Sequence, residues 1–215
     1  IGGAAVYHYG RGDGVQTPQT YVGKTSECRG LWVATVYNLN MPLYSSEAQY
    51  KAAYDSLLDE MEAAHMNAIL FQVRPRNDAF YDSAYAPWSR YLTGTEGTDP
   101  GWDVMEYLVT EAHSRGIEFH AWMNPYRVTT TSGDKTALLN ALHIENFARL
   151  HPNLVIADND GKLILNPGEP EVVTYIQSLM DSCDKQLVPP DVWSSFQNHC
   201  PHCLNALNTY SANKN

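Results

Sequence analysis

The fold of this 215-residue chain is decided by the stretch Ala68-Ile69-Leu70-Phe71-Gln72-Val73-Arg74. An apolar run of this length, rich in β-branched and aromatic residues, predicts a β-strand. Side chains alternate across a strand, so the odd-numbered residues form one apolar face while Gln72 and Arg74 lie on the other. A parallel strand that is buried on both sides is apolar throughout. The polar end of this strand therefore indicates a functional edge.

Strands and helices alternate on either side of this stretch. Further strands are predicted at residues 31–37 and 117–123, helices at 46–66, 99–116, 134–150 and from Pro170 onward, and a hairpin at 154–165 around Asp160-Gly161. Ser46 with Gln49 three residues later forms a capping box. This order predicts an α/β fold with a parallel sheet, as in doubly wound proteins or (β/α)8 barrels. Because no Gly-x-Gly-x-x-Gly motif follows any strand, dinucleotide binding is disfavoured.

Polar and aromatic residues cluster at the carboxyl ends of two of these strands and in the segments that follow them. Barrels place their active sites at the carboxyl ends of the strands, and this cluster has such a position. Each member also has a purely structural interpretation. Arg74 could form an ion pair, and Arg76 could pair with Asp78. His120 could be a hydrogen-bonded interior histidine and Trp122 a core residue, and Asn124-Pro125-Tyr126 could form a simple turn. The candidate substrate-binding residues are Arg74, Arg76, Asp78, His120, Trp122, Asn124 and Tyr126.

Composition excludes several classes of partner. The formal net charge of −10 argues against a nucleic-acid backbone or an anionic membrane surface as the main partner. No apolar run approaches the roughly 20 residues that span a bilayer. The 14 tyrosines and 5 tryptophans fit either core packing or a groove for sugars. The chain begins at Ile1 without an initiator methionine, from which we expect a mature, trimmed or truncated product.

Six ordered motifs resemble the glycosyl hydrolase-like 10 family, once called DUF187. They are residues 29–35, 71–81 and 87–94, Asp99-Pro100-Gly101-Trp102-Asp103, residues 120–127, and Leu165-Asn166-Pro167-Gly168. The resemblance implies a (β/α)8 TIM barrel from the bacterial cell envelope, often a lipoprotein. It also implies a glycosidase whose best-supported substrate is the glycan of peptidoglycan, and it assigns the ligand groove to the seven candidate residues by motif position.

The resemblance stops near the end of the last predicted helix. The family continues there to a strand with a Gly-Ile-His-x-Asp-Asp type of motif, whereas this chain has Pro189-Pro190, which a central strand excludes. We therefore divide the chain into an N-terminal extension (1–28), a partial barrel domain (29–183) and a divergent tail (184–215). The predicted strands start near Leu31, Ala68 and Glu118, which are 37 and 50 residues apart. At roughly 43 residues for each βα unit, a barrel of eight units needs about 350 residues. The prediction is an incomplete barrel of three or four βα units plus a hairpin.

The catalytic residues stay unassigned. Glycoside hydrolysis needs two carboxylates that flank the scissile bond. No predicted strand offers one at its carboxyl end, because Asp78 follows in a loop and Glu118 lies at a strand start. The hypothesis is that this segment supplies substrate-binding groups, while the acid and the nucleophile or base lie on later strands. We expect no cofactor and no metal ion, and the sequence does not indicate the oligomeric state.

The tail contains a separate motif, Cys200-Pro201-His202-Cys203. A CxxC motif forms a redox dithiol, half of a zinc site or a plain disulfide. A second CxxC is absent and the tail is too short for a thioredoxin fold, which favours a sequence that has left its reading frame or parent gene. Three function classes stay open: an envelope glycosidase or part of one, a non-catalytic carbohydrate-binding relative, and a thiol or zinc protein.

Overall fold

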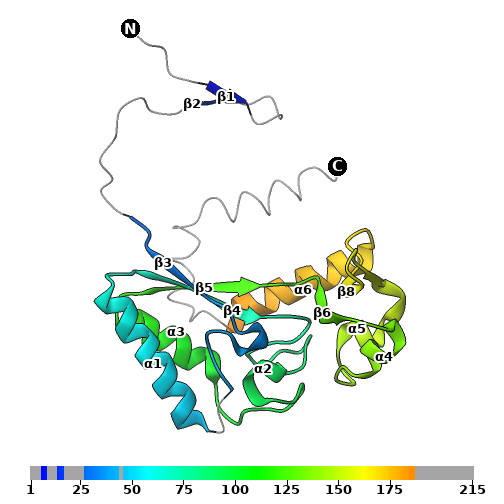
Figure 1. The fold of residues 1–215 in the computed structure, drawn as a ribbon, viewed down its shortest axis with the longest axis horizontal. Helices are drawn as coiled ribbons and strands as arrows, with labels where there is room; N and C mark the ends of the chain where they lie inside the picture. The colour runs from blue at the N-terminus through cyan, green and yellow to red at the C-terminus, as the bar shows by residue number, and fades with distance from the viewer. Residues whose placement is uncertain (1–5, 9–13, 17–26, 44–45, 187–215) are drawn as a thin grey trace.

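The computed structural model describes residues 6–8, 14–16, 27–43 and 46–186. A parallel sheet in the order β3-β4-β5 organises it, with β3 at Gly30–Val33, β4 at Ala68–Arg74 and β5 at Glu118–Met123. Helices α1 (Glu47–Ala63) and α3 (Val104–Ser114) connect these strands and lie on the same side of the sheet (Figure 1). The predicted α/β class with a parallel sheet is thereby confirmed. The CxxC motif and the rest of residues 187–215 lie outside the described residues.

The face of the sheet that α1 and α3 cover, here called the covered face, contains the main core. Phe71 is its centre: its ring lies 5.9 Å from the rings of Tyr54 and Phe119 and 6.2 Å from that of Phe80. Tyr54 comes from α1 and donates a hydrogen bond of 2.9 Å to the carbonyl of Leu108 on α3. The alternation that the sequence predicted for β4 thus packs one set of side chains under two helices. The strand residues of the covered face are Leu31, Val33, Ile69, Phe71, Val73 and Phe119.

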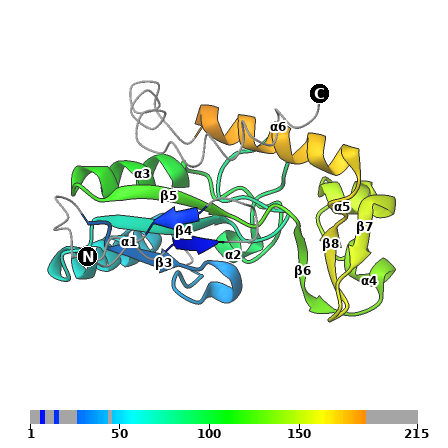
Figure 2. The same ribbon diagram turned by 90° about the horizontal axis from the view of Figure 1, so that it is seen from above.

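The opposite face, here called the open face, has no described helix over it (Figures 1 and 2). Trp32 is 59% exposed on it, and Leu70, His120 and Trp122 are half-buried. Strand register places Trp32, Leu70 and His120 side by side across the sheet. The open face therefore leaves two large aromatic side chains, Trp32 and Trp122, at least partly exposed to solvent.

A second unit with its own core follows β5 (Figure 2). Its antiparallel sheet has the order β6-β8-β7, with β6 at Arg127–Ser132, β8 at Lys162–Leu165 and β7 at Val155–Ala157. The long helix α6 (Pro170–Gln186) contributes Val172, Tyr175 and Leu179 to this core. The smaller elements of the chain are β1 (Val6–His8), β2 (Gly14–Gln16), η1 (Val36–Asn38), α2 (Arg90–Thr93), α4 (Lys135–Asn140), α5 (Phe147–Leu150) and η2 (Pro152–Leu154).

Several local predictions are confirmed. Strand β4 has the predicted bounds, Pro170 opens α6, and β7 and β8 form the predicted hairpin. Ser46 caps α1, because its hydroxyl accepts a hydrogen bond of 3.4 Å from the backbone N–H of Gln49. No helix among the described residues has the length and apolarity to cross a bilayer.

Other local predictions are wrong, each for a visible reason. The predicted strand at 31–37 ends at Val33, because the Gln72 side chain accepts hydrogen bonds from the backbone of Thr35 and Val36. Helix α3 starts at Val104 with Asp103 as its cap, since Gly101 has a φ of +80° that no α-helix contains.

The predicted helix at 134–150 and the segment that follows β5 also differ from expectation. The helix is broken into α4 and α5, and Asn146 both caps α5 and bonds to the carbonyl of Asn77. Strand β6 was missed, although its Thr-rich, β-branched sequence favours a strand.

Candidate functional site

A groove of about 620 Å³ lies at the carboxyl ends of β3 and β5, where the antiparallel unit begins. Two of the predicted site residues, Asn124 and Tyr126, line it, and the ring of Tyr126 is partly exposed. The groove therefore has the position that the strand order predicted for a site. Its walls are formed by Val36, Tyr37, Leu39, Met123, Asn124, Pro125, Tyr126, Arg127, Thr129, Thr130, Asp158, Lys162 and Ile164.

Gln72 connects the strand ends beneath this groove. Its side-chain oxygen accepts hydrogen bonds from the backbone N–H groups of Thr35 (3.1 Å) and Val36 (2.9 Å). Its side-chain nitrogen donates to Oδ1 of Asn124 at 2.5 Å. One buried amide thus positions the segments that follow β3 and β5. Gln72 was not among the predicted site residues, although a polar residue inside an apolar strand was a visible indication.

Tyr37 forms part of the groove wall in a strained conformation. Tyr37 and Asn38 both have positive φ angles, +58° and +51°, which are uncommon for residues other than glycine. The Tyr37 hydroxyl donates to the carbonyl of Thr130 at 2.8 Å, and the Asn38 amide donates to the carbonyl of Tyr91 at 2.6 Å. The Tyr37 side chain is nevertheless 58% exposed. Strain that is retained by surrounding contacts is typical of functional positions.

The open face of the sheet adds an aromatic pair to the predicted site. The Trp122 ring meets the Trp32 ring edge to face, with 5.0 Å between the centroids. His120, the neighbour of this pair on the same face, is partly exposed, and its Nε2 lies 3.2 Å from a carboxylate oxygen of Glu118. Trp32 was not predicted as a site residue, although it occupies the same face in the register of β3.

The three predicted site residues at the end of β4 and in the loop after it, Arg74, Arg76 and Asp78, are buried. The Asp78 carboxylate accepts hydrogen bonds from the backbone N–H and the guanidinium of Arg76 and from the hydroxyl of Ser89. Arg76 also pairs with Glu96 at 2.7 Å. Burial lowers the pKa of the Arg76 guanidinium. The negative charges of Asp78 and Glu96 raise this pKa by more than burial lowers it, so the net shift is upward. This network fixes the loop after β4 in the present structure, and a direct contact of these residues with substrate stays a prediction.

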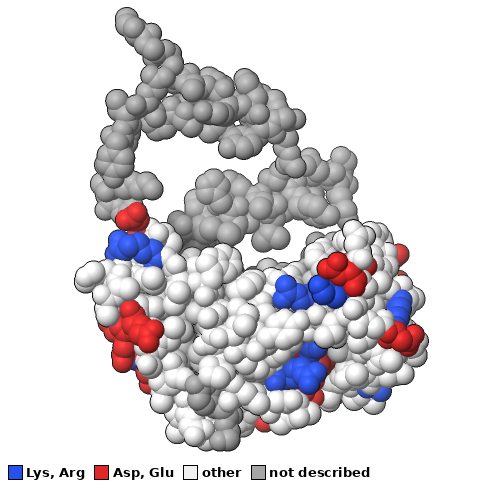
Figure 3. All heavy atoms as spheres, viewed as in Figure 1, with Lys and Arg blue, Asp and Glu red and all other residues white. Residues whose placement is uncertain are grey.

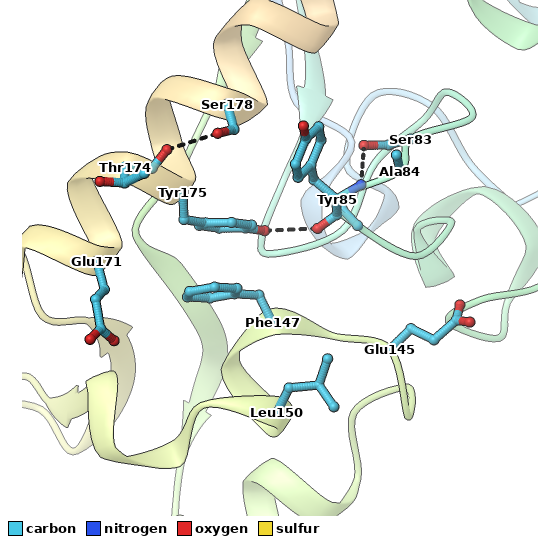
Figure 4. A pocket seen from close by; sticks show the side chains of 11 residues that line it. Ser83, Ala84, Tyr85, Glu145, Phe147, Leu150, Glu171, Thr174, Tyr175 and Ser178 are labelled. Carbon is cyan, nitrogen blue, oxygen red and sulfur yellow. Dashed lines mark hydrogen bonds between the residues drawn. The ribbon is translucent and has the colours of Figure 1, made fainter.

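Arg74 is fully buried, with its guanidinium 3.2 Å from the hydroxyl of Tyr81. A second cavity of about 650 Å³ lies nearby, between α5, α6 and the loop at residues 83–86 (Figure 4). The Phe147 and Tyr175 rings stack there at 3.7 Å. The Tyr175 hydroxyl has two acceptors within hydrogen-bond distance, the carbonyl of Tyr85 at 3.1 Å and Oδ1 of Asn77 at 3.2 Å. These contacts fasten α6 to the loop after β4.

Carboxylates are scarce in the groove. Among its described walls, Asp158 is the acidic residue, and one of its oxygens already accepts hydrogen bonds from the backbone of Asp160 and Lys162. The described part of the chain contains no cluster of three His, Cys, Asp or Glu side chains suited to a metal ion. The groove in this form offers stacking surfaces and hydrogen-bonding groups, and it lacks the two facing carboxylates of a glycosidase centre.

Comparison with known proteins identifies the family. The model of the family described as glycosyl hydrolase-like 10 matches residues 27–187. The chain belongs to the glycosyl hydrolase-like 10 family. Glycosyl hydrolase YngK of Bacillus subtilis (strain 168) is 43% identical over 152 residues, which are 70% of this chain and 29% of that protein.

Glycosyl hydrolase DigH of Escherichia coli (strain K12) is 34% identical over 181 residues, or 78% of this chain and 41% of that protein. The DigH of Shigella flexneri matches to the same extent. This glycosyl hydrolase-like chain therefore spans less than half the length of the relatives it matches, and its matched region contains β3, β4, β5 and the groove.

Proposed function

We propose that this chain forms the first part of a (β/α)8 barrel in a bacterial glycoside hydrolase that acts on glycan strands, with peptidoglycan as the substrate. The segment contributes one wall of the substrate groove. The observation behind this proposal is the continuity of the open face with the groove: the Trp32–Trp122 pair lies on the strands whose carboxyl ends form the groove. Flat aromatic rings beside amide and hydroxyl groups suit the apolar faces and polar edges of sugar rings.

The incomplete barrel is supported by the two faces of the sheet. In a (β/α)8 barrel the helices lie outside, and the inward side chains of all eight strands fill the interior. Here α1 and α3 lie on the covered face, while the open face has half-buried Leu70 and exposed Trp32. Further strands that close the barrel would cover Leu70, while Trp122, one register layer nearer the carboxyl ends, would stay beside the groove.

The catalytic groups of the proposed reaction belong to other strands. A retaining glycosidase holds its two carboxyl groups about 5–5.5 Å apart and an inverting enzyme about 6.5–9.5 Å apart. Asp78 is engaged by Arg76 and Ser89, and Glu118 lies at the opposite end of β5 from the groove. We therefore assign the acid and the nucleophile or base to strands beyond β5.

A non-catalytic carbohydrate-binding protein is the second candidate, favoured by the single acidic residue in the described groove. Release of reducing ends separates the two. By the assignment above, this chain alone should bind glycan without turnover. Turnover by a chain that also contains the later strands supports the glycosidase, whereas binding without turnover in that longer chain supports the second candidate. Loss of activity on Cys200→Ser would instead favour a thiol or zinc protein acting through the tail. We also propose an extracytoplasmic location, which cell fractionation tests.

Binding by Trp122→Ala tests whether the open face continues the glycan-binding surface of the groove. Calorimetry with soluble peptidoglycan glycan strands should show affinity reduced about tenfold, equal to about 1.4 kcal/mol. The matched control is Trp102→Ala, because Trp102 packs against Tyr50 and Tyr107 on the helix side of the sheet. Equal affinities of the two variants for the strands would contradict the proposed groove.

A further inference from the structure

We propose that the groove has an anion subsite, centred on Arg90, that binds the carboxylate of an acidic sugar in the glycan. The inference rests on the proposed function and narrows its substrate class. The subsite is a cavity of about 480 Å³ beside the groove, here called the arginine cavity. Its lining includes Arg76, Arg90, Tyr37, Thr130 and Thr131.

The arginine cavity adjoins the glycan groove directly. Tyr37, Thr129 and Thr130 line both, so the Tyr37 ring stands between them. A sugar that packs against the exposed Tyr37 ring in the groove would have its substituents within reach of the arginine cavity. The positive φ angles of Tyr37 and Asn38 support a role of this segment in binding, because strained backbone is typical of functional positions. Two hydrogen bonds, to the carbonyls of Thr130 and Tyr91 in the lining of the arginine cavity, hold the segment in place.

Arg90 is exposed, and its side chain differs from those of the paired cations of the chain in its lack of a partner among the described residues. Within the described ranges its guanidinium makes no ion pair and no hydrogen bond. Arg115, at the other end of the sheet, is surrounded by Asp55, Asp59, Glu62 and Glu111. A chain with a net charge of −10 offers many acidic partners, so an arginine beside the groove that lacks one is available to a ligand.

A second arginine beside the groove has a similar environment. Arg127 lines the groove and donates to the carbonyl of Pro75 at 3.3 Å, and no carboxylate pairs with it among the described residues. In Figure 3, basic atoms lie over the region of α2 and β6, with acidic atoms beside those near β6, and a further group of acidic atoms lies over part of α1. This basic region favours an anionic ligand over a neutral one.

The acidic groups near the arginine cavity are already engaged in ion pairs or hydrogen bonds. Asp78 and Glu96 both pair with Arg76, and they are buried. In the adjoining groove, Lys162 pairs with Asp160 at 3.1 Å, and Asp158 accepts two backbone hydrogen bonds. A guanidinium binds a carboxylate through two parallel hydrogen bonds, and the Thr131 hydroxyl offers a further donor on the same wall.

The test compares two forms of one ligand. The full chain is titrated calorimetrically with peptidoglycan glycan strands and with the same strands after their carboxylates have been converted to amides. The wild-type chain should bind the acidic strands about tenfold more tightly, in line with one charge-assisted bidentate contact. In Arg90→Gln this preference should fall toward one, and in Arg90→Lys it should be intermediate, because lysine keeps the charge but not the planar fork.

The control is Lys51→Gln, which removes one positive charge on α1, where Lys51 pairs with Glu47. It should keep the wild-type preference, and circular dichroism confirms that each variant is folded. Equal binding of both strand forms by the wild type, or an unchanged preference in Arg90→Gln, overturns the subsite and leaves the glycan groove standing. If the wild type binds neither form, the proposed function fails and the subsite fails with it.

Discussion

The two faces of the parallel sheet differ in what their side chains contact. On the covered face, Phe71 packs among rings from α1, β5 and the loop after β4, without exposure to water. On the open face, Trp32 and Trp122 contact each other and remain partly exposed. Alternate residues of the same strands thus serve different purposes. One set stabilises the fold through burial, and the other presents aromatic and polar groups to whatever lies over the sheet.

Phe71→Ala tests the covered face and should have the largest effect. Removing a fully buried ring that contacts Tyr54, Phe80 and Phe119 should lower the free energy of unfolding by about 3–5 kcal/mol. Urea unfolding followed by circular dichroism measures the change. Leu70→Ala, one residue away on the open face, is the matched control and should cost clearly less. Similar losses for both variants would remove the distinction between the faces.

Gln72→Met addresses the exception on the open face, a polar side chain that is fully buried. Methionine has nearly the same volume but leaves the backbone N–H groups of Thr35 and Val36 without their acceptor. Each unsatisfied buried group costs about 1–3 kcal/mol. Because Val36 is less completely buried than Thr35, we expect the two amides to cost values near the lower end, so the free energy of unfolding should fall by about 2–3 kcal/mol. Hydrogen exchange at these two amides should quicken more than at α1. A variant as stable as the wild type would mean that the connection between the strand ends contributes little.

How far the fold could be predicted from the sequence depends on whether an element is determined by neighbouring or by distant residues. The apolar pattern of β4, the capping box at Ser46 and the hairpin at Asp160-Gly161 depend on neighbouring residues, and all were predictable from the sequence. The early end of β3 and the break between α4 and α5 depend on distant partners. Gln72 is 37 residues from Thr35, and Asn146 is 69 residues from Asn77. No local pattern contains such contacts.

The pH dependence of unfolding gives a second test of the covered face. Burial raises the pKa of the Tyr54 phenol well above its usual value, with smaller contributions from Tyr50 and Glu111. The folded state therefore keeps this phenol neutral, and its contribution is complete below pH 10, where the unfolded phenol is also neutral. Above about pH 10 the unfolding free energy should fall by up to about 1.4 kcal/mol per pH unit from this group.

Tyr54→Phe is the control for that measurement, since it removes the ionisable group and keeps the ring. Its unfolding free energy, followed by urea titration from pH 9 to 11, should fall less steeply with pH than that of the wild type. Identical slopes would show that the Tyr54 hydroxyl becomes accessible to base in the folded protein.

The site was only partly predictable. Strand alternation pointed to His120, Trp122 and Asn124, which the structure places on the open face and at the groove. Alternation does not distinguish a buried polar residue from an exposed one, so it could not indicate that Arg76 and Asp78 are enclosed by Glu96 and Ser89. Burial of these groups depends on the fold of the loop after β4, which has no periodic pattern.

Trp32→Ala is the converse of Phe71→Ala and should have the smallest effect on stability. The Trp32 side chain is 59% exposed and its main described ring contact is the edge-to-face pair with Trp122, worth about 0.5–1.5 kcal/mol. The free energy of unfolding in urea should therefore fall by at most about 1.5 kcal/mol, while glycan affinity measured by calorimetry should fall severalfold. Trp102→Ala should show the opposite pattern, because that ring packs with Tyr50 and Tyr107 beside α1. If Trp32→Ala instead lowers stability as much as Phe71→Ala and leaves affinity unchanged, the open face is structural and its exposed aromatic pair does not contribute to recognition.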